Sequence, residues 1–323
     1  MIYPEFIRKG ETIGIFAPSA GVGKKLEDYE RGLEELKKLG YEVRETASVR
    51  VNGERSAGGR KRAAELKELA EDEEVKMIIC AAGGDFMYEM MPYVDFKTLQ
   101  AHPKWIMGHS DPTNLLFPLT VKYDIATIYG FNAGYDEPKA KFQRDNMRII
   151  SGETVKQKSF RKYKTFLEMI SDEKRYTHEV KWISKGDQVL KGRIIGGCLD
   201  AIVPLFSTPF DGIRDFLERY EKDGILWYFD IFAMDPLTVY LTLLQMKNAG
   251  YFRHCRGVLF GRIAFPGEGN ITYLEAYRKA LGRIPWIAET DIGHTDPHFT
   301  VINGALAEVR CSDGKGSISF SLE

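Results

Sequence analysis

The sequence predicts an α/β protein whose N-terminal half is a doubly wound, mostly parallel sheet of the flavodoxin or Rossmann type. Short, nearly continuous apolar runs, typical of strands covered on both faces, alternate with amphipathic runs of helical period. Turns containing glycine or proline separate them, as in βαβ units. The chain has 323 residues, a length that favours more than one domain.

In the first half, strand-like and helix-like runs follow each other in regular order. The expected strands are residues 12–17, 41–44, 75–80, 105–107 and 125–128, and the expected helices are residues 26–39, 60–69 and 114–122. Ligands of such open sheets bind at the carboxyl ends of the strands. Gly83, Gly84 and Ser110 directly follow such ends, so this edge of the sheet is the expected site.

The second half again alternates strand-like and helix-like runs, after a charge-rich segment at residues 139–191. Its expected strands are residues 224–230, 257–260 and 286–288, its expected helices are residues 213–220, 236–249 and 273–281, and its tail has an alternating strand pattern. We therefore expect an N-terminal domain, a charge-rich crossing segment and a C-terminal domain at residues 1–138, 139–191 and 192–323.

Composition and charge bear on the class of partner and on the expected location. Lys and Arg number 45 against 46 Asp and Glu, and no basic patch stands out, which argues against nucleic acid or an anionic membrane. No signal peptide and no apolar run of about 18 residues is visible, so we expect a cytoplasmic protein. The four cysteines lie far apart, which favours buried free thiols over disulfide, zinc or catalytic roles: Cys80, Cys198, Cys255 and Cys311.

Ser110 lies on the turn between the strand at 105–107 and the helix at 114–122, where Asp111, Pro112 and Thr113 supply cap and first-turn chemistry. This is the geometry of a nucleophile elbow, which exposes a serine Oγ beside the N–H groups of a helix N-terminus. Pro112 replaces the last glycine of G-x-S-x-G, so the match is partial. A purely structural serine at the helix start is the alternative.

A nucleophilic serine needs a base, and the base needs an orienting acid. His294 is favoured because it lies in a glycine-containing loop after a strand-like run, with His298 in reserve. His109, next to the serine, is expected to line the pocket wall. Asp230 ends an apolar strand, where a buried carboxylate needs a partner. A cap for the helix at 236–249 or an exposed strand end remains an equal alternative for Asp230.

Several motifs occur in one order along nearly the whole chain: Ala17-Pro18-Ser19, Gly83-Gly84, residues 92–96, residues 103–113, Tyr129-Gly130, residues 192–200 and Gly293-His294-Thr295. Together they resemble the LD-carboxypeptidase family of serine peptidases, which also contains the microcin-immunity peptidases. The resemblance implies a doubly wound N-terminal domain and a smaller C-terminal α/β domain with barrel-like strands. It also implies a cytoplasmic homodimer that uses neither metal nor cofactor.

The resemblance implies a role for each matching position. The expected catalytic residues are the nucleophile Ser110, the base His294 and the acid Asp230. The expected oxyanion hole consists of the backbone N–H groups of Gly84 and Asp111. Substrate binding is expected at Gly83, His109 and Tyr129.

The implied reaction is hydrolysis of an amide near the C-terminus of a small peptide, with a murein tetrapeptide cut to the tripeptide as the main expectation. The alternatives are microcin-type action on peptidyl or aminoacyl nucleotides, and a ligand-binding relative with weak turnover. Two positions depart from the family pattern. Asp230 stands where the family usually has Glu, and Ala82 stands where many relatives carry Arg, so no guanidinium there can pair with a substrate carboxylate.

Overall fold

A computed structural model describes the chain apart from residues 134–140, 172 and 268. The described residues form two compact units, of which the first contains Met1–Val155 and Thr300–Asn303 and the second Lys156–Phe299 and Gly304–Glu323. The boundary expected between residues 138 and 139 lies outside the described residues. The three-part functional division of the chain stays a prediction.

The first unit is built on a six-stranded sheet with the order β14-β5-β4-β3-β1-β2. All neighbouring strands are parallel except β14 and β5. The strands are β1 (Thr12–Phe16), β2 (Glu42–Glu45), β3 (Val75–Cys80), β4 (Trp105–Gly108), β5 (Thr127–Tyr129) and β14 (Val301–Asn303). The order of the parallel strands reverses between β1 and β3, which is where doubly wound sheets bind ligands.

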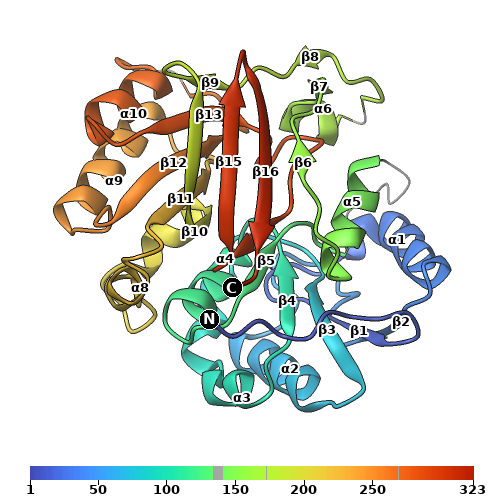
Figure 1. The fold of residues 1–323 in the computed structure, drawn as a ribbon. Coiled ribbons are helices and arrows are strands. Elements are labelled where there is room, and N and C mark those ends of the chain that lie inside the picture. The colour runs from blue at the N-terminus through green and yellow to red at the C-terminus, as the bar shows by residue number, and fades with distance from the viewer. Residues whose placement is uncertain (134–140, 172, 268) are drawn as a thin grey trace. The chain divides into compact units, whose positions relative to one another are not determined.

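Helices accompany this sheet (Figure 1): η1 (Gly23–Lys25), α1 (Leu26–Lys38), α2 (Gly59–Glu71), η2 (Met87–Tyr93), α3 (Phe96–Ala101), α4 (Thr113–Val121) and α5 (Lys141–Ile150). On α1, Tyr29, Leu33 and Leu36 are buried, as expected for an amphipathic helix. All residues of α4 are buried, so this helix belongs to the core. The helix that starts beside Ser110 is therefore held firmly against the sheet.

The second unit contains an eight-stranded sheet with the order β6-β16-β15-β10-β11-β12-β13-β9. Strands β10 to β13 are parallel, and the other pairings are antiparallel. The strands are β6 (Gln157–Lys158), β9 (Ile183–Ser184), β10 (Gln188–Cys198), β11 (Ile225–Asp230), β12 (Cys255–Gly261), β13 (Trp286–Thr290), β15 (Leu306–Ser312) and β16 (Lys315–Ser321).

The remaining elements of the second unit are the antiparallel pair of β7 (Lys162–Tyr163) and β8 (His178–Glu179), and the helices α6 (Phe166–Ile170), α7 (Leu199–Ile202), η3 (Val203–Leu205), α8 (Ile213–Arg219), α9 (Pro236–Asn248) and α10 (Tyr273–Leu281). Among the described residues, the two-residue edge strands β6 and β9 do not pair with each other. The expected barrel-like arrangement of the second unit's strands is therefore wrong. The sheet is open, and the antiparallel hairpin of β15 and β16 extends it instead of closing it.

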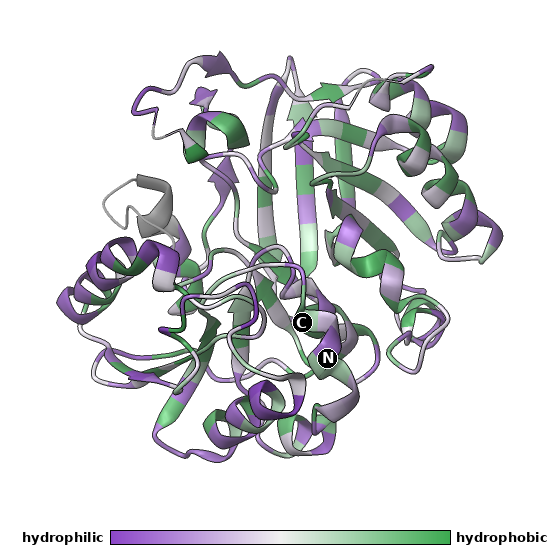
Figure 2. Ribbon diagram, turned by 180° about the vertical axis from the view of Figure 1, so that it is seen from behind, coloured by the Kyte–Doolittle hydropathy of each residue, from purple (hydrophilic) through white to green (hydrophobic). Residues whose placement is uncertain are grey.

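Both sheets have apolar cores, and Figure 2 shows green, hydrophobic stretches in their strands beside purple, hydrophilic ones. Every residue of β11 is buried, as its uninterrupted apolar sequence indicates. The predicted α/β fold, with a mostly parallel first sheet and a second sheet domain, is confirmed. Among the described residues, no helix has the length and apolar character needed to cross a lipid bilayer.

The close approach of β10 and β11 gives a test of the packing in the second unit's sheet. Gly196 of β10 lies opposite Tyr228 of β11, and a Cβ on Gly196 would come within 1.8 Å of the Tyr228 carbonyl oxygen. We expect Gly196→Ala to lower the free energy of unfolding in urea by about 3 kcal/mol, because the backbone must shift. Gly269→Ala, with only ordinary contacts nearby, is the control. Equal stability of the two variants would contradict this packing.

Candidate active site

Ser110 lies on a sharp turn between β4 and α4. Its φ is 71°, in the left-handed region that non-glycine residues seldom adopt. The Thr113 N–H donates to the Ser110 carbonyl oxygen at 2.9 Å, which closes the turn. A Cβ on Gly108 would lie 2.5 Å from the Pro112 Cβ, so the tight turn needs glycine there. The partly exposed Ser110 thus has the backbone geometry of a nucleophile elbow.

Asp111 does not cap the helix in the way the sequence suggests. The N-cap position of α4 is Pro112, and no side chain caps the helix. The Asp111 carboxylate instead accepts hydrogen bonds from the Met87 N–H and from Asn114 Nδ2, both at 2.9 Å. Burial raises the pKa of Asp111, although hydrogen bonds from the Ser19 hydroxyl and the Met87 N–H oppose the shift. Asp111 therefore ties the serine turn to the loop after β3.

The glycine pair after β3 lies against the serine turn. A Cβ on Gly83 would be 3.2 Å from the Ser110 Cβ, and one on Gly84, whose φ is 142°, would be 2.5 Å from Ser19 Oγ. Ser19 holds this loop, since the Phe86 N–H donates to its Oγ at 3.0 Å. Among the described residues, the backbone N–H groups of Gly84 and Asp111 have no hydrogen-bond acceptor. Such unused donors can stabilise a developing negative charge.

His109 and Tyr129 brace the same turn. The Ser110 N–H donates to the Tyr129 hydroxyl oxygen at 3.1 Å, and the rings of His109 and Tyr129 pack 4.9 Å apart. Asn132 exchanges two hydrogen bonds with the His109 backbone, at 3.0 and 3.1 Å. Both rings are buried. Their contact with substrate stays a prediction.

In the second unit, His294 and Asp230 form a buried pair. Nδ1 of His294 lies 2.7 Å from Oδ2 of Asp230, which is fully buried at the end of β11. The residue before the histidine must be glycine. A Cβ on Gly293, whose φ is 98°, would lie only 2.2 Å from Asp230 Oδ1. The shorter acid therefore reaches the imidazole. The ring of His294 also packs against Phe232 and Phe166, with centroids 4.4 and 5.9 Å away.

The loop that carries His294 is held by a buried arginine that sequence reasoning missed. Arg262 donates to Asp291 Oδ1 at 2.6 Å, to Thr295 Oγ1 at 2.8 Å and to the Pro297 carbonyl at 2.8 Å. Burial raises the pKa of Asp291, and the Arg262 charge opposes that shift. The available signal was a cation directly after the apolar strand β12, analogous to the acid that ends β11. The reserve base His298 is also buried in this loop region.

Asp200, in α7 at the end of the glycine-rich motif of residues 192–200, fixes the loop after β11. Its carboxylate accepts hydrogen bonds from the N–H groups of Phe232 and Ala233, at 3.0 and 2.9 Å. Neighbouring Cys198 is buried, and burial together with the charges of Asp230 and Asp200 raises its pKa. The thiol therefore stays protonated and is a poor nucleophile. All four cysteines are free, and three of them are buried as predicted, whereas Cys255 is only partly buried.

One cluster in the second unit has metal-ligand spacing. Glu218, Glu221 and His254 each bring one ligand atom to within 4.8 Å of the others. However, Arg253 Nη1 lies 2.6 Å from Glu218 Oε1, so an ion pair already balances one of the two carboxylates. A metal ion would have to displace that pair, and we assign no metal to this cluster.

A serine on a strained strand-to-helix turn and a buried histidine–carboxylate pair are components typical of serine peptidases. Residues 13–130 match the family model described as LD-carboxypeptidase N-terminal domain, and residues 191–309 match the model of the LD-carboxypeptidase C-terminal domain. The two matches cover most of the chain. The chain therefore belongs to the LD-carboxypeptidase family.

Individual relatives agree with this membership. The "Probable murein peptide carboxypeptidase" of Bacillus subtilis (strain 168) is 25% identical, over 96% of this chain and 92% of its own. The solved structure of the microcin C7 self-immunity protein MccF in complex with aspartyl sulfamoyl adenosine superposes with a TM-score of 0.84, at 20% identity, over 100% and 99% of the chains. A muramoyltetrapeptide carboxypeptidase from Oxalobacter formigenes gives 0.77, at 20% identity, over 96% and 99%.

The strained turn predicts an unusual order of stability. Ser110→Gly and Ser110→Ala both remove the hydroxyl, but only glycine adopts a φ of 71° without steric cost. We expect the glycine variant to be more stable than the alanine variant by about 1 kcal/mol in urea unfolding. The same pair of substitutions at Ser207, an exposed serine with a φ of 60°, is the control and should show a similar difference. Equal stability of the Ser110 variants would mean that the turn is not strained.

Proposed function

We propose that this protein is a serine peptidase that hydrolyses an amide near the C-terminus of a small peptide. Ser110 is the nucleophile, His294 the general base and Asp230 the acid that orients the imidazole. The N–H groups of Gly84 and Asp111 form the oxyanion hole. Membership of the LD-carboxypeptidase family supports a peptidase, and the local geometry of each unit supports the individual roles.

The proposed reaction follows the chemistry of an acyl-enzyme. Ser110 Oγ attacks the carbonyl carbon while Nε2 of His294 takes the hydroxyl proton. With its own proton on Nδ1, which faces the Asp230 carboxylate, His294 keeps Nε2 free to accept that proton. Negative charge on the carbonyl oxygen is stabilised by the two N–H groups. His294 then protonates the leaving amine, and a water molecule hydrolyses the ester by the same steps in reverse.

The observation that carries the proposal is the pairing of a left-handed Ser110 with two neighbouring N–H groups that lack acceptors among the described residues. A serine that merely began a helix would not need such a turn. A second observation supports turnover over a binding role. The Asp230 carboxylate lies 2.7 Å from the imidazole, so replacing the family's usual Glu does not separate the acid from the base.

We propose a muropeptide as the substrate, cut between an L-centre and a terminal D-amino acid, and a cytoplasmic homodimer as the working form. The murein peptide carboxypeptidase relative supports the muropeptide as the substrate. The rival substrate is a peptidyl or aminoacyl nucleotide. Ala82 favours the rival, because alanine offers no charge for a terminal carboxylate, and the likeness to MccF, solved with aspartyl sulfamoyl adenosine, is compatible with it in fold.

A substrate panel tests the reaction and chooses between the rivals. We expect purified protein to release D-Ala from tetrapeptide muropeptide, followed by mass spectrometry, and Ser110→Ala to lower the rate at least about 10³-fold. Cleavage of aminoacyl-nucleotide amides alone would favour the rival substrate. Equal release by the wild type and Ser110→Ala would contradict the serine mechanism.

Removing the charge of the acid tests the second half of the triad. We expect Asp230→Asn to lower kcat by about 10³- to 10⁴-fold with little change in KM, because the amide no longer fixes the imidazole tautomer. Asp215→Asn, on the exposed side of α8, is the matched control and should leave kcat unchanged. A loss of less than tenfold for Asp230→Asn would rule out the orienting role.

A further inference from the structure

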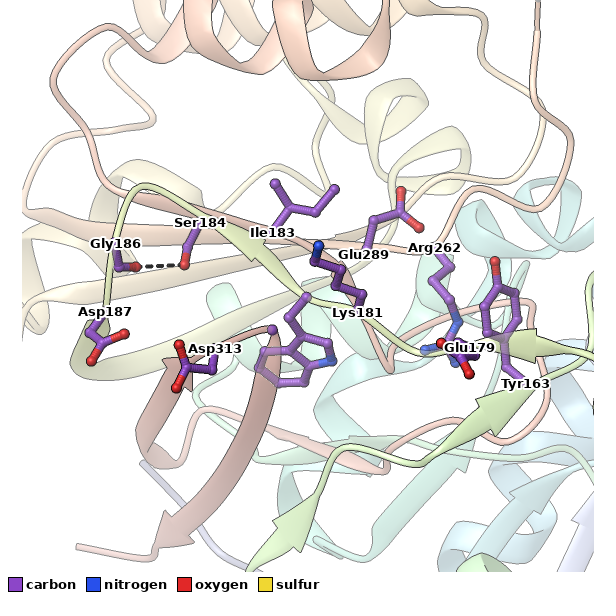
Figure 3. A pocket seen from close by; sticks show the side chains of 12 residues that line it. Tyr163, Glu179, Lys181, Ile183, Ser184, Gly186, Asp187, Arg262, Glu289 and Asp313 are labelled. Atoms are coloured by element: carbon purple, nitrogen blue, oxygen red, sulfur yellow. Dashed lines mark hydrogen bonds between the residues drawn. The ribbon is translucent and has the colours of Figure 1, made fainter.

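The second unit contains a large cavity beside the edge of its sheet (Figure 3). Its volume is about 860 Å³, within the range of small-molecule sites. It is lined by Tyr163, Glu179, Lys181, Trp182, Ile183, Ser184, Gly186, Asp187, Arg262, Glu289, Asp313 and Gly314. Neither His294 nor Asp230 lines it. The cavity is therefore separate from the histidine–carboxylate pair.

Glu289 reaches this cavity through an irregularity in the sheet. The register of β12 and β13 shifts between Leu259 and Gly261, whose partners are Ile287 and Thr290, so β13 contains one extra residue. Glu289 lies in that extra stretch with a φ of 56°. Bulges of this kind re-aim side chains and occur at functional sites, and the left-handed backbone costs about 1 kcal/mol or more. The strained backbone at Glu289 thus places its carboxylate in the cavity.

The Glu289 carboxylate has no counter-ion of its own. Among the described residues it makes no hydrogen bond and no ion pair, although it is partly buried. Arg262 is nearby, but its donors are used by Asp291, Thr295 and Pro297. Burial raises the pKa of Glu289, which is the expected penalty for a carboxylate that lacks a partner. A ligand that supplies a positive charge would remove this penalty.

The rest of the lining selects for the same charge. The Arg262 guanidinium is balanced by Asp291, so the remaining charged side chains are Lys181 and four carboxylates, Glu179, Asp187, Glu289 and Asp313. Their excess negative charge attracts cations. Among the described residues, these carboxylates do not form a group with metal-ligand spacing. An organic cation therefore fits the cavity better than a metal ion.

We propose that this cavity binds a primary ammonium group, carried by a small amine or by the side chain of a peptide, with Glu289 as its counter-ion. Figure 3 shows Arg262 and Tyr163 at one end, Asp187 and Asp313 at the other, and Glu289 between them. The site does not depend on the proposed peptidase activity. Its occupancy should be the same in Ser110→Ala.

The test is calorimetric titration of the full-length protein with 1,5-diaminopentane at constant ionic strength, with 1-pentanol as the neutral control compound. We expect saturable binding of the diamine, and a loss of affinity of about tenfold or more in Glu289→Gln. Glu221→Gln, an exposed carboxylate outside the cavity, should bind like the wild type. Absence of saturable binding, or equal binding by Glu289→Gln, would overturn the proposal.

Lys181→Gln is expected to change the affinity for the diamine in the opposite direction. Lys181 is exposed and lines the cavity with a positive charge that repels a cation, so its removal should tighten diamine binding severalfold. Weaker binding would contradict an acidic site. The peptides Ala-Lys and Ala-norleucine separate the two sources of the amine. Binding of both the diamine and Ala-Lys, but not of Ala-norleucine, indicates that a peptide side chain fits, whereas binding of the diamine without Ala-Lys indicates a free amine. Binding of 1-pentanol as tightly as the diamine would exclude a charge-directed site.

Discussion

The 2.7 Å contact between His294 and the buried carboxylate of Asp230 is the interaction on which the second unit's chemistry depends. A carboxylate at the end of an apolar strand is costly unless a polar partner compensates it. Gly293 makes the approach possible because any Cβ there would collide with the acid. Arg262 then fixes the rest of the loop from the end of the neighbouring strand.

The first unit also contains an unfavourable feature that its surroundings must compensate. Ser110 occupies an unfavourable backbone conformation, and buried polar contacts on both sides keep it there: the Tyr129 hydroxyl on its N–H, and the Asp111 carboxylate on the loop after β3. Polar groups buried in this way specify one geometry. In both units, many surrounding contacts therefore hold a few reactive side chains in position, as preorganised sites require.

The strands and helices that were predicted with bounds from local periodicity lie within one or two residues of those in the structure, because apolar runs and terminal glycines are local features of the sequence. The long strand β10 and several short elements were not predicted. Strand β14 was missed, since three residues at 301–303 pair with β5 across more than 170 positions of sequence. The carboxylate of Asp111 was misjudged for the same reason: its partner Met87 is distant in sequence. The roles of Arg262 and Glu289 likewise depend on contacts that only the folded sheet creates.

The central claim is that Ser110 is an activated nucleophile, and covalent labelling tests it most directly. Incubation with a fluorophosphonate, followed by peptide mapping in the mass spectrometer, should place one label on each chain at Ser110. Modification of another residue, or an unlabelled chain whose circular dichroism remains native, would contradict the account.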